Sequence, residues 1–452
     1  MFEAYKQILD HLQPVGVTGR VSAVRGLTVG VADFPAPMGA ACRIVSGHRS
    51  VEARVIGFAG KQALAMPLGA MAGIARGDRV VLTAARQSVA LSGEMLGRVL
   101  NGMGVPIDGG RELHADSLAA IWPEPIAPMR RRAISEPLAT GVRAIDAVLT
   151  VGRGQRMGIL AGSGVGKSVL LGMIGRCASA DVTVIALIGE RGREVGEFID
   201  KNLGPDGLKR SVVVVATSDE PPLVRVQASA VATAVAEYFR DRGCDVLLLM
   251  DSLTRLAAAQ RQIGLVAGEP PTTKGYTPSV FSLLPELLER CGRTEAGSIT
   301  GFYTVLVEGD DPADPISDAV RAVTDGHVQL SRDLVGRGQY PAVDVLQSVS
   351  RVMIDVTDAQ QQAAAREVQK LIGVHREIEE LVNIGAYQSG SNEDCDLAIG
   401  IMPAIRRLLA QEVDEPADFE QTRRMLADVH EQIVAERNRL TGRAAAGAAV
   451  KA

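Results

Sequence analysis

A glycine-rich loop in this chain has the composition of a phosphate-binding site. Residues 161–168 read A-G-S-G-V-G-K-S and lie between an apolar strand pattern, MGILA, and a helical pattern, VLLGMIG. Small residues let successive backbone N–H groups face a polyphosphate, and the following helix N-terminus adds partial positive charge. Lys167 would then reach the β- and γ-phosphates, and Ser168 would bind Mg²⁺. We therefore expect nucleotide contacts from Gly162, Ser163, Gly164, Val165, Gly166, Lys167, Ser168 and Val169.

The loop departs from the strict pattern G-x-x-x-x-G-K-[ST] at one position. Ala161 stands where the pattern has its first glycine. That position mainly needs a small residue, and the strand and the helix on either side are both present. We therefore keep the interpretation as a nucleotide phosphate loop over that of a structural glycine turn.

An acidic strand end supports this interpretation. The apolar run DVLLLMD, residues 245–251, closes with Asp251. A strand buried on both faces presents its last residue at the carboxyl edge of the sheet, where ligands bind in open α/β folds. Such a run is by itself often a plain strand end, but after a phosphate loop it predicts that Asp251 binds Mg²⁺ through water.

ATP hydrolysis also needs a carboxylate that orients or activates water. The strand after the phosphate-loop helix ends in G-E-R-G-R-E-V, residues 189–195. An acid at the tip of this neighbouring strand can face the γ-phosphate, which makes Glu190 the candidate. Spacing alone leaves Glu194 and Glu197 open as alternatives, and all three could instead be solvated charges at a helix start.

The elements that must position these residues form an α/β domain. Apolar strand patterns alternate with helical patterns from about residue 130, which favours a parallel sheet covered on both faces. The segment IWPEPIAPMRRRAISEPLATG holds four prolines and predicts an extended linker between an N-terminal barrel and this sheet. We assign 91–355, including the linker, to the nucleotide-binding domain.

Different patterns flank this domain. Short β-rich runs separated by Gly and Pro over 17–90 predict a small antiparallel β-barrel. Charged helical patterns predict a C-terminal helical domain over 356–440, followed by a frayed, flexible tail at 441–452. Residues 1–16 predict a short amphipathic helix that either packs in the core or docks a partner. Its apolar stripe comprises Phe2, Tyr5, Ile8, Leu9 and Leu12.

Composition excludes several classes of protein. The 452 residues are 46% hydrophobic and 22% charged, which is typical of a globular chain of two or three domains and not of a disordered one. A net charge of −5 gives no global field for nucleic acid or anionic lipid. The five cysteines lie far apart without a C-x-x-C pair, which favours reduced thiols over a zinc site. We see no signal-peptide pattern and no run of about 18 apolar residues, so we expect neither secretion nor a membrane span.

Longer motifs resemble one known family. The segments AGSGVGKS, LIGERGREV, LLLMDSLTR, GEPPTTKGYTPSVFSLLPELLERCG, VEGDDPADPISD, DGHVQLSR and QYPAVDVLQSVSR are similar to catalytic subunits of the rotary ATPase superfamily. Within it the chain most resembles the type III secretion ATPases, particularly the flagellar export ATPase, from about residue 17 to 440. The resemblance implies a RecA-like P-loop NTPase core and Mg²⁺-dependent hydrolysis of ATP.

The resemblance also implies residue roles. Glu190 matches the family's catalytic carboxylate, and Lys167 its phosphate-binding lysine. Arg191 and Arg255 match positions that contact the phosphates or stabilise the closed site. Tyr340 matches an aromatic residue that packs on adenine, although a core tyrosine remains an alternative. Arg351, in S-V-S-R, matches an arginine finger that acts in trans.

A self-associating ring follows from the last match. One chain carries both the phosphate loop and the finger motif, so identical chains can supply Arg351 to one another, and we expect a homohexamer. The family resemblance implies an accessory stalk regulator at the N-terminal helix, a central stalk-like coiled-coil protein, an export gate and chaperone–substrate complexes. It also implies a cytoplasmic protein that associates only peripherally with the cytoplasmic face of the inner membrane.

Three alternatives to a flagellar export ATPase are considered. A virulence-type secretion ATPase differs only in short segments, of which GIARGDRV and NIGAYQSGS favour the flagellar type. A rotary proton or sodium ATPase is disfavoured because LVNIGAYQSGSNED replaces the acidic DELSEED segment. A hexameric RNA helicase would bring an RNA-binding domain and basic pore loops, and the acidic chain argues against nucleic acid as a partner.

Overall fold

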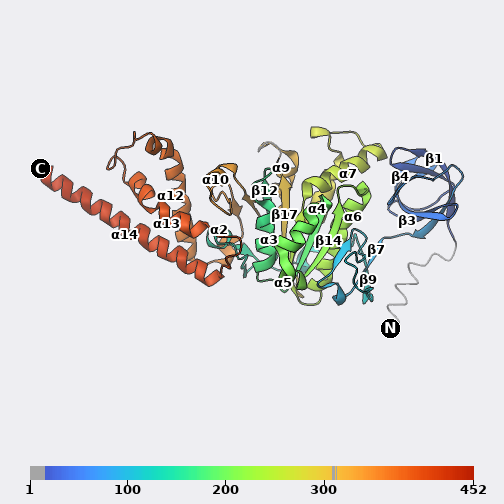
Figure 1. The fold of residues 1–452 in the computed structure, drawn as a ribbon, viewed down its shortest axis with the longest axis horizontal. Helices are drawn as coiled ribbons and strands as arrows, with labels where there is room; N and C mark the ends of the chain where they lie inside the picture. The colour runs from blue at the N-terminus through green and yellow to red at the C-terminus, as the bar shows by residue number, and fades with distance from the viewer. Residues whose placement is uncertain (1–15, 308–310, 312, 452) are drawn as a thin grey trace.

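Three parts follow one another along the long axis of the molecule. The computed structural model describes residues 16–307, 311 and 313–451. Figure 1 shows a β-barrel at one end, an α/β domain in the middle and helices at the other end. This order confirms the fold expected from the sequence. The predicted N-terminal helix lies outside the described residues.

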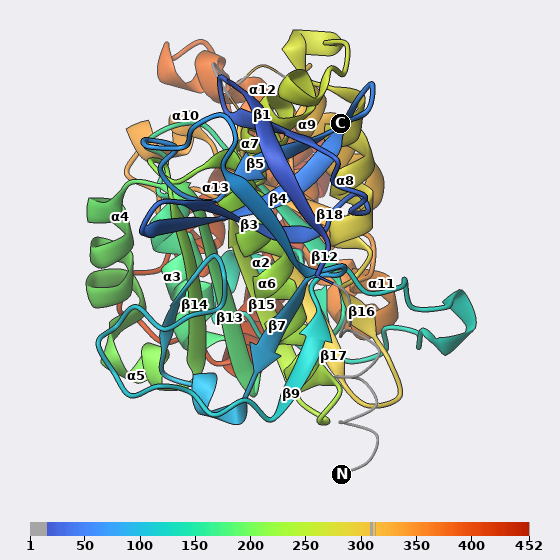
Figure 2. The same ribbon diagram turned by 90° about the vertical axis from the view of Figure 1, so that its right-hand side faces the viewer.

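The N-terminal barrel consists of six antiparallel strands that close on themselves in the order β1-β2-β5-β4-β3-β6. Alternation of side chains fills it: in β3 Cys42 and Ile44 are buried, whereas Arg43 between them is exposed. Figure 2 shows the barrel in front of the central sheet. The strands are β1 (Thr18–Arg25), β2 (Thr28–Ala32), β3 (Ala41–Ser46), β4 (Arg49–Ala59), β5 (Gln62–Pro67) and β6 (Arg79–Ala84). The predicted range of 17–90 reaches slightly further, into β7 (Ser88–Leu91), which pairs outside the barrel with β9 (Ser117–Ala120).

The central domain is built on a nine-stranded sheet with the order β19-β18-β12-β17-β15-β13-β14-β8, and β16 pairs with β17. All neighbours are parallel except β19 on β18 and β16 on β17. The strands are β8 (Val99–Asn101), β12 (Arg156–Ala161), β13 (Val182–Glu190), β14 (Ser211–Thr217), β15 (Asp245–Asp251), β16 (Gly292–Arg293), β17 (Ser298–Leu306), β18 (Gly326–Gln329) and β19 (Val349–Ser350).

Helices cover both faces of this sheet, as its continuous apolar strands require. One face packs on α6 (Pro222–Arg240), α7 (Leu253–Ala267) and α8 (Pro278–Leu288), and the other on α3 (Lys167–Cys177). Shorter elements complete the domain: η1 (Gly93–Met95), η2 (Pro128–Arg130), β10 (Pro137–Leu138), α2 (Arg143–Val148), β11 (Val151–Gly152), α4 (Gly192–Glu197), η3 (Phe198–Leu203), α5 (Gly204–Lys209), η4 (Thr273–Gly275), α9 (Pro315–Val323), α10 (Arg332–Gly336) and α11 (Met353–Val356).

The proline-rich segment does not lead directly from barrel to sheet. The edge strand β8 precedes it in the chain and already pairs with β14, so the segment instead connects this edge to the start of the core. A strand of three residues is too short for a periodic pattern, which explains why the sequence does not reveal it.

The C-terminal domain consists of α12 (Ala359–Asn383), α13 (Glu393–Leu409) and α14 (Phe419–Lys451). These helices share an apolar core with α2 and α3 of the central domain. The segment 441–452, expected to be a frayed tail, continues α14 as far as Lys451. Its alanine-rich sequence accounts for this, because alanine has the highest intrinsic helix propensity. Within the described part of the chain, we find no helix long and apolar enough to cross a membrane.

Candidate functional site

The glycine-rich loop joins β12 to α3 at the carboxyl ends of the parallel strands. Gly164 and Gly166 adopt φ values of 79° and 91°, which side-chain-bearing residues rarely adopt. Gly166 caps the N-terminus of α3, Val165 is buried beneath the loop, and Ser163 is exposed. The sequence therefore folds here into a cradle of N–H groups at a helix N-terminus, which suits a polyphosphate.

Two cations and two carboxylates meet at the carboxyl edge of the sheet. The Lys167 ammonium donates a hydrogen bond to Asp251 Oδ1 and lies 3.7 Å from Glu190 Oε1. Arg255 Nη2 lies 3.2 Å from Glu190 Oε2. Asp251 also accepts a 2.7 Å hydrogen bond from Thr304 Oγ1 on the adjacent strand β17. The structure thus brings together Lys167, Glu190 and the Asp251–Arg255 segment, which are separate in the chain.

Glu190 has the environment of a proton acceptor. It is 8% exposed, and its Oε1 has no hydrogen-bond partner in the described structure. Burial raises the pKa of its carboxyl to about 7, with further contributions from the hydrogen bond to Glu194 and from the charge of Asp251. The same hydrogen bond lowers the pKa of Glu194. Of the three acids that the sequence left open, only Glu190 touches both Lys167 and Arg255. A carboxylate with a pKa near neutrality suits general base catalysis.

Glu190→Gln should keep nucleotide binding and lose turnover. The amide preserves the shape and the contact with Arg255, but it cannot take a proton from water, so kcat should fall by roughly 10²–10⁴. In the native protein, kcat/KM should rise with pH through about 7, as the Glu190 carboxyl loses its proton. The residual activity of the variant should lack this rise. Steady-state kinetics with a parallel nucleotide titration measure both effects.

A matched control lies on the next helix. Glu197 in α4 is partly exposed and pairs with Arg193 at 3.7 Å, away from Lys167. Glu197→Gln should therefore leave both kcat and KM unchanged. A parallel loss of nucleotide affinity and turnover in Glu190→Gln would instead make Glu190 a binding residue.

Ser168, on the first turn of α3, and Asp251, which contacts Lys167, offer hard oxygen donors beside the phosphate cradle. Ser168 is exposed on the first turn of α3, and its carbonyl accepts a hydrogen bond from Asn202. No group of three or more His, Cys, Asp or Glu residues that could hold a metal ion occurs among the described residues. A hydroxyl and one carboxylate fit an ion such as Mg²⁺, which keeps waters and takes most of its ligands from substrate phosphates.

Tyr340 borders an apolar cavity beside the phosphate loop. The cavity, of about 250 Å³, is lined by Val165, Val169, Met173 and Tyr340 among others. Tyr340 is 48% exposed, which excludes the alternative of a core tyrosine in this structure. Its position next to the phosphate cradle fits a flat heterocycle such as adenine.

The C-terminal domain supplies a wall of this cavity that the sequence did not predict. Gln411 and Val413 line it, and Gln411 donates its backbone N–H to the carbonyl of Tyr340 at 2.9 Å. The Gln411 side chain also binds the backbone of Gly141 and Arg143. These residues carry no local motif, because only the packing of the helical domain on the sheet brings them to the loop.

The remaining predicted arginines lie elsewhere. Arg191 is exposed and its guanidinium lies 3.3 Å from Glu194. Glu194 in turn hydrogen-bonds Glu190, so Arg191 reaches the cluster around Lys167 only through Glu194. Arg351 is exposed just after β19, and its backbone N–H donates to the carbonyl of Asp325 at 2.9 Å. No described contact joins Arg351 to Lys167, Glu190 or Asp251 of the same chain.

Arg351 lies at the amino ends of the parallel strands, whereas the phosphate loop lies at their carboxyl ends. Asp325 lies at the start of β18, beside Arg156 at the start of β12, whereas the loop follows the end of β12. The six residues of β12 separate the two edges by roughly 17 Å at about 3.3 Å per residue. An arginine side chain does not span this distance along the sheet.

Comparison with known proteins gives a consistent result. Residues 141–350 match the nucleotide-binding domain of the ATP synthase alpha/beta family, and residues 357–428 match the T3SS EscN ATPase C-terminal domain. The chain is 51% identical to a flagellum-specific ATP synthase of Treponema pallidum, covering 92% of this chain and 94% of the relative. It is 48% identical to a type 3 secretion system ATPase of Xanthomonas euvesicatoria, covering 91% and 93%.

A solved structure agrees over the same length. The assembled ATPase EscN from the enteropathogenic E. coli type III secretion system matches with a TM-score of 0.87 at 41% identity, covering 91% of this chain and 99% of that one. EscN in complex with its central stalk EscO matches with a TM-score of 0.85. Together with the phosphate cradle and the buried carboxylate, these matches establish that the chain is an ATPase that belongs to the family of flagellum-specific ATP synthases and type 3 secretion system ATPases.

Proposed function

We propose that identical chains assemble into a homohexameric ring whose ATP hydrolysis drives or assists type III protein export, and that the export system is flagellar. The position of Arg351 carries the ring proposal, because a finger at the edge opposite its own phosphate loop can serve only a neighbouring site. That the similar EscN was solved in assembled form supports it. The sequence identity is 51% to a flagellar relative and 48% to a type 3 secretion system ATPase. Because this difference is small, a virulence-type system is the second candidate.

Each residue of the site has a part in the proposed hydrolysis. The N–H groups of 162–168 and Lys167 bind and orient the phosphates, and Glu190 accepts a proton from the attacking water. Ser168 and, through water, Asp251 would hold Mg²⁺. When bound, this ion neutralises charge on the phosphates. Arg255 holds the Glu190 carboxylate in place at 3.2 Å, and the cavity beside Tyr340 takes the base. Arg191 completes the closed site only if α4 moves its side chain from Glu194.

The ring proposal predicts that activity depends on concentration. An isolated chain holds a phosphate loop without a finger beside it, so specific activity should rise with protein concentration as rings form. Hydrolysis rates measured over a dilution series, with the mass distribution recorded at each concentration, should rise together with the ring fraction. Full activity of a demonstrated monomer at every dilution would reject the shared site.

The N-terminal segment is the proposed docking site for an accessory stalk regulator. The helix predicted from the sequence for its stripe of Phe2, Tyr5, Ile8, Leu9 and Leu12 would be too short to be stable alone in water. Deletion of residues 2–14 should spare basal ATPase activity and abolish capture of the regulator in a pull-down. Loss of the barrel's thermal transition in the deletion would favour the alternative that the stripe packs in the core.

Further partners of the proposed ring are a central stalk-like coiled-coil protein, an export gate and chaperone–substrate complexes. The solved complex of EscN with its central stalk EscO supports the first of these. We place the ring in the cytoplasm, peripherally at the cytoplasmic face of the inner membrane. Neither stimulation by nucleic acid nor proton-driven ATP synthesis is expected, which separates this function from those of helicases and rotary ATP synthases.

A further inference from the structure

A buried glutamine connects three segments at the edge of the sheet that carries Arg351. Gln155 is fully buried, and its amide Nε2 donates to the carbonyl of Asp325 at 3.2 Å and to Ser350 Oγ at 3.1 Å. Its Oε1 accepts from the N–H of Gly152 at 2.8 Å. Asp325 and Ser350 both hold the backbone of Arg351. The Asp325 carbonyl accepts the Arg351 N–H, and Ser350 precedes Arg351 in the chain. A single side chain therefore fixes both anchors of the finger.

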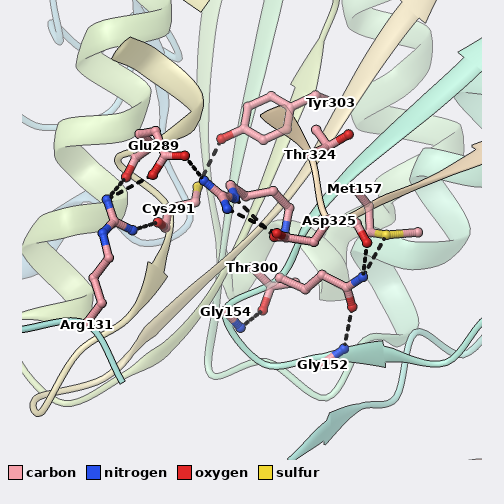
Figure 3. Close-up of polar contacts among 12 residues, drawn as sticks. Arg131, Gly152, Gly154, Met157, Glu289, Cys291, Thr300, Tyr303, Thr324 and Asp325 are labelled. Atoms are coloured by element: carbon pink, nitrogen blue, oxygen red, sulfur yellow. Dashed lines mark hydrogen bonds and ion pairs between the residues drawn. The ribbon is translucent and has the colours of Figure 1, made fainter. Parts of the chain in front are cut away.

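The carboxylate of Asp325 is held independently. It accepts two hydrogen bonds of 3.0 Å from the guanidinium of Arg156 and one of 3.0 Å from the Arg156 backbone N–H. Arg156 is in turn paired with Glu289 at the end of α8, and Glu289 lies 3.3 Å from Arg131. Figure 3 shows Asp325 in the middle of this network, between Glu289 and Gly152. Bidentate pairing of this kind fixes orientation as well as distance.

Close packing leaves little room for the strand β19 to shift. A Cβ on Gly326 would lie 2.3 Å from the carbonyl oxygen of Val349 and 2.8 Å from Met157 Sδ. Ser350 Oγ also donates to the carbonyl of Thr150 at 2.8 Å. The backbone before and at Arg351 is thus fixed from several sides, while its side chain is exposed. A fixed base with a free tip suits a residue that must reach a partner at a defined position.

We propose that Gln155 and Asp325 are positioning residues: they fix the backbone of Arg351 where its side chain can enter the catalytic site of the neighbouring chain. The proposal rests on the proposed trans role of Arg351. Substitution of Gln155 or Asp325 should therefore impair hydrolysis in the neighbouring chain's site and leave the chain's own phosphate loop intact. Gln155 immediately precedes β12, whose other end leads to that loop, so the alternative is an effect in cis.

The substitution Gln155→Met tests the proposal, because methionine keeps the length and removes the side-chain hydrogen bonds to Gly152, Asp325 and Ser350, together with that to Met157 Sδ. A misplacement of about 1 Å costs roughly 10² in rate, so kcat of the pure variant should fall by about that factor, with nucleotide affinity unchanged. Mixing the variant with Lys167→Ala should then restore activity. The variant supplies an intact phosphate loop, and the Lys167→Ala chain supplies a well-placed Arg351.

Three controls decide the outcome. Asp325→Asn keeps the shape and weakens the bidentate pair, and it carries the test if Gln155→Met does not assemble. Arg153→Gln breaks the ion pair with Asp245 at the same edge of the sheet without touching β18 or β19, and it should keep kcat. Arg351→Ala mixed with Lys167→Ala is the reference for the trans role itself.

Unchanged kcat in both folded variants would overturn the proposal. So would a loss that the Lys167→Ala chain does not restore, in mixed rings that the reference pair does activate, because the damage would then lie in the variant's own phosphate loop. Failure of the reference pair in demonstrated mixed rings would instead refute the trans role of Arg351, and with it the proposed shared site.

Discussion

Lys167→Ala is expected to give a folded protein that assembles and has no detectable ATP hydrolysis. The Lys167 ammonium contacts Asp251 and lies 3.7 Å from Glu190 Oε1. Its removal takes away the point charge that reaches the β- and γ-phosphates. The backbone N–H groups of the loop remain, so weak nucleotide binding should persist. Phosphate-release assays and a nucleotide titration measure the two effects separately.

The fold should tolerate this change because the two carboxylates keep other partners. Asp251 retains the hydrogen bond from Thr304 at 2.7 Å, and Glu190 retains Arg255 at 3.2 Å. Loss of the lysine should raise the pKa of Glu190 further, since Lys167 is one of the two charges that lower it. Lys209→Ala is the matched control: this exposed lysine pairs with Asp206 on α5 and should be dispensable. Near-normal turnover in folded Lys167→Ala would remove the basis of the phosphate-loop assignment.

The local part of the site could be predicted from the sequence because each residue follows a strand. Lys167, Glu190 and Asp251 come after or at the end of β12, β13 and β15, and these strands are parallel. The carboxyl ends of parallel strands meet at one edge, so a pattern of apolar runs with polar ends is enough to bring them together. Spacing alone leaves Glu194 open beside Glu190, and the family resemblance favours Glu190. In the structure Glu190 ends β13, is buried and contacts Lys167 and Arg255, whereas Glu194 lies in α4 and pairs with Arg191.

The base cavity could not be predicted in the same way. Gln411 and Val413 reach it from the segment after α13, and nothing in their local sequence signals a ligand. Neighbouring residues also diverge: Arg255, on the first turn of α7, turns toward Glu190, whereas Arg191, beside Glu190 in sequence, turns to Glu194 and solvent. The family resemblance gave both arginines the same role, yet their side chains point to different places. Arg191 is the N-cap residue of α4 and Arg255 lies in the first turn of α7, and these positions follow from the fold and not from the local sequence.

Arg351→Ala should lose most of the activity while sparing the fold and the chain's own nucleotide binding. A finger that neutralises charge on the transferred phosphoryl group contributes roughly 10³–10⁵ in rate, so the pure variant should be nearly inactive. The Arg351 side chain is exposed and its backbone bonds do not depend on the guanidinium. Nucleotide affinity should therefore match the native protein. This loss alone, however, does not tell a trans finger from a residue of the same chain's site.

Mixing separates the two cases. In rings of Arg351→Ala and Lys167→Ala chains, about one interface in four of an equal mixture pairs an intact Lys167 with a neighbour's intact Arg351, if each chain faces the next head to tail. Two inactive proteins should then regain a substantial part of native activity, and the gain should vanish on dilution below ring assembly. If Arg351 acted within its own chain, every chain would lack one of the two groups, and no ratio of the two variants would hydrolyse ATP. Mass measurement of mixed rings makes either result decisive, because it shows that both variants share a ring. The roughly 17 Å along β12 between Arg351 and its own phosphate loop is the reason to expect the trans result.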